Sequence, residues 1–112
     1  MDSPNIKRRY LRRDVTLPIK FELDGESRSC LTTTIGEGGM YLQSLLPPPV
    51  GTRLSLEFEL LEGQVIKVTG EVRHSLSNNY GSLPAGFGVQ FLDLTEKDRN
   101  LILDFVNSEA LG

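Results

Sequence analysis

Four arginines lie within six residues near the start of the chain, in the segment KRRYLRR at residues 7–13. A guanidinium group is a planar fork that can hold a phosphate, or one edge of a purine, through two parallel hydrogen bonds. Arg8 and Arg12 are four residues apart, so they align on one face of a helix or lie about 13 Å apart in an extended chain. Either geometry can hold a ligand with two anionic groups. A solvated basic arm is the alternative interpretation of the same spacing.

The net charge of −3 conceals an uneven distribution. Residues 1–20 hold six lysines and arginines against two aspartates, which gives +4, whereas residues 21–112 hold six basic against thirteen acidic residues, which gives −7. Proteins that bind duplex nucleic acid gather lysine and arginine on a broad face. The distribution therefore indicates a small anionic ligand or a local acidic partner, and no DNA or RNA.

Residue types that carry catalysis are scarce in this chain. It has one cysteine, Cys30, and one histidine, His74, and it lacks the common nucleophile, phosphate-loop and paired-carboxylate motifs. No cysteine or histidine has the spacing of a metal ligand. Cys30 lies in a strand-like run, where a small buried thiol is expected, and His74 stands at the predicted end of a strand. We therefore expect no enzymatic activity, no metal and no cofactor.

Cysteine content and apolar runs bear on the cellular compartment. A single cysteine cannot form an internal disulfide, and the first fourteen residues lack the apolar core of a signal peptide. Nowhere do 18 apolar residues run together, so no membrane-spanning helix is predicted. These features favour a cytoplasmic protein that does not insert into a membrane.

Residues from position 15 onward have the pattern of short β-strands. Apolar residues occupy every odd position from Val15 to Leu23, and the turn dipeptide Asp24-Gly25 leads into a β-branched return strand. Further strands are predicted at MYLQSL, 53–60, 65–74 and 86–91. Three glycines in residues 36–39 interrupt the pattern; glycine permits a positive φ or a close approach between backbones.

The periodicity changes near the C-terminus. Thr95 resembles an N-cap, and apolar residues then line one helical face, which predicts a helix at about 95–107. A chain of 112 residues makes one domain. We predict a flexible basic arm at 1–14 and, at 15–112, a mainly β domain. This domain is a small antiparallel barrel of six to seven strands with one C-terminal α-helix, because closure of a barrel removes exposed strand edges.

Six segments, taken in order, resemble the PilZ domain family. They are RRYLR, DVTLPIKFEL, IGEGGMYL, PPPVGTRLSLEFEL, GEVRH and GFGVQFLDLTEKDR. The likeness extends from about Lys7 to Val106 and rests on the order and spacing of the segments, since none of them is specific alone. It implies the split barrel of a bacterial PilZ domain.

PilZ domains are bacterial receptors for cyclic di-GMP, a ring of two guanylates with two phosphates. The resemblance implies that the arginines of an RxxxR motif hold phosphates and guanine edges, while a second motif, [D/N]xSxxG, closes over a guanine. Arginine matches the O6 and N7 acceptors of guanine and can stack on the base. Tyr10 fits the aromatic residue that commonly separates the motif arginines. The motif is then Arg8 and Arg12, with Arg9 as a supporting contact and Arg13 structural or solvated.

The second motif departs from the family pattern. With Gly39 as its glycine, TIGEGG stands where [D/N]xSxxG is expected, so Thr34 replaces the acid or amide and Gly36 replaces the serine. The loss of such contacts costs about 1–3 kcal/mol, roughly ten- to a hundredfold in affinity. Thr33 or Thr34, together with backbone amides of the glycine turn, can substitute for them.

Two functions are consistent with these observations. The first is a PilZ-type cyclic di-GMP receptor whose N-terminal arm changes conformation on binding and signals to a downstream protein. The second is a degenerate PilZ domain that no longer binds cyclic di-GMP and acts as a protein-protein adaptor in motility, pilus or exopolysaccharide control. Retention of both motif arginines favours the first. Its predicted ligand-binding residues are Arg8, Arg9, Arg12, Thr34, Gly36 and Gly39.

A third function, binding of single-stranded nucleic acid on the barrel surface, is disfavoured. Such surfaces stack bases on exposed aromatic side chains. The chain has no tryptophan, and Phe58, Phe87 and Phe91 occupy alternating positions that are predicted to face inward.

Overall fold

The computed structural model describes residues 12–61 and 63–111. These residues form seven strands and a helix: β1 (Arg12–Asp14), β2 (Pro18–Leu23), β3 (Glu26–Gly36), β4 (Gly39–Gln43), β5 (Arg53–Glu59), β6 (Val65–Leu76), β7 (Gly86–Phe91) and α1 (Glu96–Leu111). The last three residues of the predicted arm thus form β1, and α1 continues past the predicted end at about residue 107.

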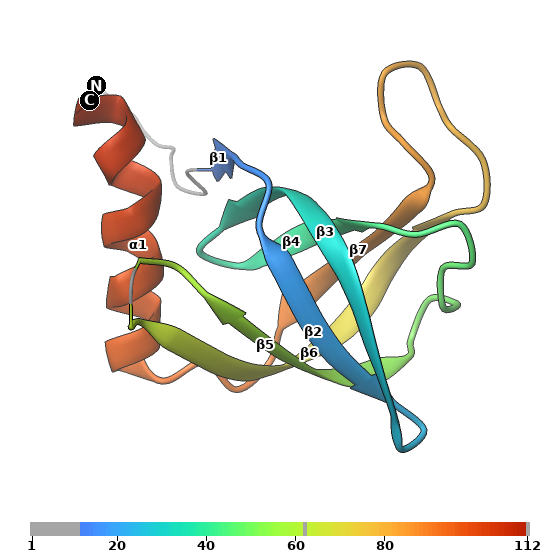
Figure 1. The fold of residues 1–112 in the computed structure, drawn as a ribbon, viewed down its shortest axis with the longest axis horizontal. Helices are drawn as coiled ribbons and strands as arrows, with labels where there is room; N and C mark the ends of the chain where they lie inside the picture. Colours follow the sequence, from blue (N-terminus) through green and yellow to red (C-terminus); the bar gives the residue numbers. More distant parts are fainter. Residues whose placement is uncertain (1–11, 62, 112) are drawn as a thin grey trace, which may run out of the picture.

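The strands form a closed antiparallel barrel. Their order in the sheet is β1-β3-β2-β5-β6-β7-β4, and an additional pairing of β3 with β4 joins the ends of a six-stranded cylinder. Strand β1 lies outside the cylinder and pairs with the last residues of β3. Figure 1 shows the barrel with α1 standing beside it, on the side where β1 lies. The prediction of a small β-barrel with one C-terminal helix is confirmed.

The β2–β3 hairpin follows directly from its sequence. Its turn residues Asp24 and Gly25 have φ values of 53° and 79°, the conformation of a type I′ turn, whose twist matches that of the strands. Along β2, Ile19 and Phe21 are buried while the intervening lysine and glutamate are exposed. The alternation seen in the sequence thus predicts which face of this strand enters the core.

The barrel interior is filled by aliphatic and aromatic side chains. Phe87 is completely buried and meets Phe21 edge to face, with ring centroids 5.8 Å apart, and Phe58 stacks on Phe91 at 6.1 Å. The predicted inward orientation of the three phenylalanines is confirmed. Helix α1 covers this core with three buried apolar side chains, Ile102, Phe105 and Val106.

Helix α1 is fixed at both of its ends. At its start, the Thr95 hydroxyl accepts a hydrogen bond from the Asp98 amide at 3.1 Å, which confirms Thr95 as the N-cap. Near its end, Arg13 of β1 donates from Nη1 to the Phe105 carbonyl oxygen at 2.9 Å and to Ser108 Oγ at 3.2 Å. The Arg13 guanidinium also lies 4.3 Å from the centroid of the Phe105 ring. Arg13 therefore has a structural role and joins β1 to the helix.

A β-bulge in β3 lies where the barrel closes. Thr32 pairs with Leu42 of β4, but the register shifts so that Thr34, rather than Thr33, pairs with Tyr41. The Thr32 side chain is fully buried, and its hydroxyl donates to the Tyr41 carbonyl oxygen at 2.6 Å, with the Thr34 carbonyl oxygen at 3.0 Å. This hydroxyl satisfies backbone acceptors beside the bulge, where the regular ladder is interrupted.

Two glycines allow β4 and β7 to pair closely at both ends of their ladder. A Cβ at Gly39 would lie 2.0 Å from the Val89 carbonyl oxygen, and one at Gly86 would lie 2.0 Å from the Leu42 carbonyl oxygen. Both positions thus exclude any side chain. Within residues 12–61 and 63–111, positive φ values occur at Asp24 and at glycines 25, 51, 63 and 81, so Gly39 serves a close approach and not a left-handed backbone.

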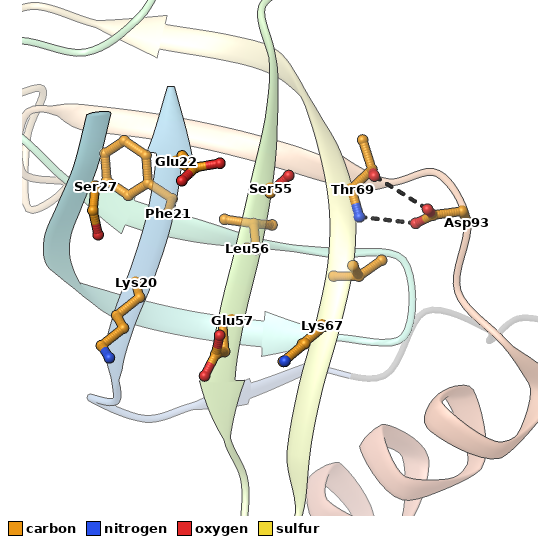
Figure 2. A pocket seen from close by; sticks show the side chains of 11 residues that line it. Lys20, Phe21, Glu22, Ser27, Ser55, Leu56, Glu57, Lys67, Thr69 and Asp93 are labelled. Atoms are coloured by element: carbon orange, nitrogen blue, oxygen red, sulfur yellow. Dashed lines mark hydrogen bonds between the residues drawn. The ribbon is translucent and has the colours of Figure 1, made fainter. Parts of the chain in front are cut away.

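Asp93, which follows β7, ties the chain back to β6. Its carboxylate accepts hydrogen bonds from the Thr69 amide at 2.8 Å and from the Thr69 hydroxyl at 3.1 Å, as Figure 2 shows. The amide hydrogen bond is the main reason that the pKa of Asp93 is lowered. These bonds fix the connection between the last strand and α1.

Replacement of Gly86 by alanine should destabilise the barrel, because its methyl group would collide with the β4 backbone. We expect a loss of about 1–3 kcal/mol in the free energy of unfolding, measured by urea denaturation. Gly38→Ala is the matched control, since a Cβ there meets nothing within 4 Å, and it should change stability by less than about 0.5 kcal/mol. Equal stability of the two variants would contradict the close approach described here.

Removal of the Asp93 carboxylate should lower the free energy of unfolding by an amount that depends on pH. Because the pKa in the folded protein is lowered, the stabilisation by Asp93 is present above the unfolded-state pKa of about 4 and is lost as the pH falls through the folded-state pKa. Urea denaturation of wild type and Asp93→Ala should therefore differ at pH 7 and converge at low pH. Thr69→Val keeps the amide hydrogen bond and should retain most of this pH dependence. A constant difference between wild type and Asp93→Ala across this range would argue against the assigned role.

Candidate functional site

The strand register brings together the four predicted binding residues that the structure describes, which are Arg12, Thr34, Gly36 and Gly39. Arg12 of β1 lies opposite Gly36 at the end of β3, and its Nε donates to the Thr34 hydroxyl oxygen at 3.2 Å. Gly39, the first residue of β4, pairs with Gln90 of β7. Thr34 lies two residues before Gly36 and therefore on the same face of β3, so the regular β1–β3 register brings it to Arg12.

A hollow of about 390 Å³ opens beside these residues, within the size range of small-molecule sites. Its polar side chains are Arg12, Arg73, His74 and Gln90. The remaining lining residues are Gly38, Gly39, Met40, Tyr41, Gly88 and Val89. No carboxylate is among the described residues that line it, although the domain as a whole is acidic. The hollow is therefore suited to an anion.

The six predicted binding residues fall into three groups. Arg12 and Gly39 line the hollow, whereas Thr34 holds Arg12 from the side and Gly36 supplies the backbone opposite it. Arg8 and Arg9 lie outside the described residues. Gly39 has a second reason to be glycine, because the backbone of β7 leaves no room for a Cβ.

Two residues of the hollow, Arg73 and His74, were absent from the predicted binding set. The sequence predicts His74 at the end of a strand, but β6 continues to Leu76 and carries a register shift between Val72 and His74. As a result Arg73 and His74 are both exposed, although neighbours in a regular strand face opposite sides. Alternation in the sequence gives no sign of such a shift, because both residues are polar.

A larger hollow, of about 500 Å³, lies on the outer face of β2, β5 and β6 (Figure 2). Lys20, Glu57 and Lys67 are register partners that cross this face in one row. Two further carboxylates, Glu22 and Asp93, also line the hollow. Opposite charges alternate here, so the face offers an anion no net attraction comparable to that beside Arg12.

The Cys30 thiol and the Tyr41 hydroxyl are the other side chains with the potential to react, and burial affects both. Burial raises the pKa of the Cys30 thiol to about 11, so the thiolate that would be needed for nucleophilic attack is scarce at neutral pH. Burial also raises the pKa of Tyr41, whose hydroxyl donates to the Pro84 carbonyl oxygen at 2.8 Å. In residues 12–61 and 63–111, no three His, Cys, Asp or Glu side chains come together as they would around a metal ion.

No helix in the described part of the chain combines the length and the apolar character needed to cross a membrane.

Comparison with solved structures identifies related folds. The inhibitor of motility MotI/DgrA of Bacillus subtilis superimposes with a TM-score of 0.80 at 21% identity, over 96% of this chain and 53% of that protein. The present chain thus spans about half the length of the Bacillus protein. The PilZ domain of YcgR from Escherichia coli, solved with c-di-GMP, gives a TM-score of 0.71 at 17% identity and covers 92% of this chain and 91% of that domain.

A third similar structure is PlzA of Borreliella burgdorferi, solved in complex with c-di-GMP. Its TM-score is 0.58 at 19% identity, over 80% of this chain and 32% of that protein. No curated protein sequence matches the chain significantly. At these identities the structural matches establish the fold alone.

A sequence model of a protein family assigns the chain to a family, which the structural similarity alone does not do. The model described as the PilZ domain matches residues 6–108, which include the arginine segment, all seven strands and most of α1. The order of segments that resembles this family in the sequence is thus matched over nearly the whole chain, and the chain belongs to the PilZ domain family.

Proposed function

We propose that this domain is a receptor for cyclic di-GMP and binds it at the hollow beside Arg12. The observation that carries the proposal is that Arg12, which Thr34 holds by a hydrogen bond, and Gly39 meet at a hollow lined by cations and by no described carboxylate. Family membership supports the choice of ligand, since the similar YcgR and PlzA structures contain c-di-GMP.

In this proposal Arg12 makes the central contact with the ligand. Its guanidinium can grip a phosphate or the O6 and N7 edge of guanine, and the Thr34 hydroxyl holds its Nε so that the outer nitrogens face the hollow. Arg8 and Arg9 complete the arginine cluster. Gly39 lines the hollow with backbone alone, and Gly36 supplies the backbone opposite Arg12. No residue is assigned a catalytic role.

The proposed output is a change at the N-terminal segment. The ligand neutralises the arginine cluster that leads into β1 and ends within it, and this alters the surface that the domain offers to a downstream protein. The cytoplasm, where the second messenger is produced and read, is the compartment that this proposal requires.

A ligand-free adaptor is the second candidate, and the departure at Thr34 and Gly36 favours it. The family motif places an acid or amide and a serine at these two positions, so two potential ligand contacts are missing. The Thr34 hydroxyl is also already engaged by Arg12. In this role the same arginines would pair with acidic side chains of a partner protein.

Isothermal titration of the full chain with cyclic di-GMP tests the first candidate. We expect binding by wild type and a loss of at least about tenfold in affinity for Arg12→Ala, because one charged hydrogen-bond donor group is removed. Arg28→Ala is the control, since Arg28 lies on the exposed start of β3 and pairs with Glu26. A wild-type dissociation constant above about 100 μM, or equal affinities of wild type and Arg12→Ala, would refute ligand binding at this site.

Restoration of the family residue distinguishes the two candidates. Thr34→Asp should tighten cyclic di-GMP binding by about tenfold, because a carboxylate accepts two hydrogen bonds from Arg12 and from guanine donors. The same titration measures this gain, with Thr33→Asp as the control on the neighbouring bulge position. If neither wild type nor Thr34→Asp takes up ligand, the adaptor function is favoured.

A further inference from the structure

The bulge in β6 places two cationic or titratable side chains on the same outer face. Val72 pairs with Val89, and after the shift His74 pairs with Gly88, so Arg73 is the extra residue. Bulges often redirect a side chain near a functional site. Here the bulge directs Arg73 and His74 toward the hollow whose opposite side is formed by Arg12 of β1.

One row of register partners connects the two sides of the hollow. Thr34 pairs with Tyr41, Tyr41 with Gly88, and Gly88 with His74, so residues from β3, β4, β7 and β6 lie side by side. Asp14 of β1 pairs with Thr34 and extends the row. The barrel thus presents Arg12 at one end of a short polar strip and the β6 bulge at the other.

Gly88 forms the floor between these two sides. A Cβ built there would lie 3.5 Å from His74 Cδ2 and 3.6 Å from Tyr41 Cδ1, which is ordinary van der Waals contact. A methyl group therefore fits, whereas a longer side chain at this position would extend into the hollow. The lack of a side chain at Gly88 keeps the space between the imidazole and phenol rings open.

Arg73 is only weakly engaged by neighbouring side chains. Its Nε lies 3.9 Å from Glu71 Oε2, too far for a hydrogen bond, and the other oxygen of Glu71 is 3.4 Å from Arg53 Nε. Half of the Arg73 side chain is exposed. An exposed ion pair of this length contributes little, so the guanidinium can turn to an incoming anion at small cost.

We propose that Arg73 and His74 bind a phosphate group of the ligand on the side of the hollow opposite Arg12. The charged groups around this position are Glu71 and Arg53 on the β6 and β5 side and Arg12 and Asp14 on β1, while β7 contributes the uncharged Gly88 and Gln90. Two guanidinium groups and an imidazole then face one space. The inference depends on the proposed function for the identity of the whole ligand, but not for the anion site itself.

Two probes separate the anion site from the proposed ligand. Cyclic di-GMP is titrated by calorimetry, and inorganic pyrophosphate, which has phosphates but no guanine, is titrated by NMR with the amides of His74 and Gly88 as reporters. Arg73→Gln should weaken binding of both probes about tenfold and reduce the salt dependence of binding. Arg53→Gln is the matched control, because Arg53 pairs with the same Glu71 but lies outside the hollow, and it should change both affinities less than about twofold.

Gly88→Leu tests the site without removing a charge. It should strongly weaken binding of both probes by occupying the floor of the hollow between His74 and Tyr41, while Gly88→Ala, whose methyl group fits, should keep the fold and most of the affinity. A urea titration checks that each variant folds. If Gly88→Leu does not fold, the comparison of Arg73→Gln with Gly88→Ala and wild type still tests the site.

The possible results distinguish this inference from the proposed function. If pyrophosphate binds in an Arg73-dependent manner but cyclic di-GMP does not bind, the anion site is supported and the proposed function fails. If cyclic di-GMP binding depends on Arg12 but Arg73→Gln behaves like Arg53→Gln for both probes, the proposed function holds and this inference is overturned. If neither probe binds wild type, both are overturned.

Discussion

The pairing of β3 with β4 closes the barrel, and both the core and the candidate site depend on it. Without this pairing the sheet would have two open edges, and the inward side chains of β4 and β7 would lose their cover. The buried Thr32 hydroxyl supports the closure at the point where the ladder is irregular. Thr34, which follows the irregularity, pairs with Tyr41 on one side and with Asp14 of β1 on the other. The segment of β3 that closes the barrel therefore also carries the residue that meets Arg12.

Most of the fold could be predicted because its determinants are local. Alternating apolar residues indicate each strand and the face that it buries, the Asp24-Gly25 pair indicates the hairpin, and Thr95 indicates where the helix begins. Part of the candidate site could also be predicted, because the sequence contains the arginine and glycine positions of a family motif and these positions meet at one hollow. Arg12, Thr34 and Gly39 belong to that part.

The bulges in β3 and β6 could not be predicted from the sequence. A bulge adds one residue to a strand. It can be recognised in the sequence only when the extra residue interrupts the alternation of apolar and polar positions. Thr33 stands among other threonines, and Arg73 precedes a second polar residue, so neither interrupts a visible pattern. Their effect appears only when the partner strand fixes the register. The side of the hollow built by β6 therefore became visible only in three dimensions.

Arg12 and Arg13 are consecutive residues of one extended strand, and their side chains have different neighbours. Arg12 faces the hollow, while Arg13 is bound to the Phe105 carbonyl and to Ser108 in the last turns of α1. A single peptide bond thus separates the residue that lines the candidate site from the residue that contacts α1. A movement of β1 at Arg12 therefore either strains the Arg13 hydrogen bonds to the last turns of α1 or is taken up by rotation within the Arg13 side chain. The last turns of α1 thus hold the same strand that carries Arg12 to the hollow, although Phe105 lies more than ninety residues away from Arg13 in sequence.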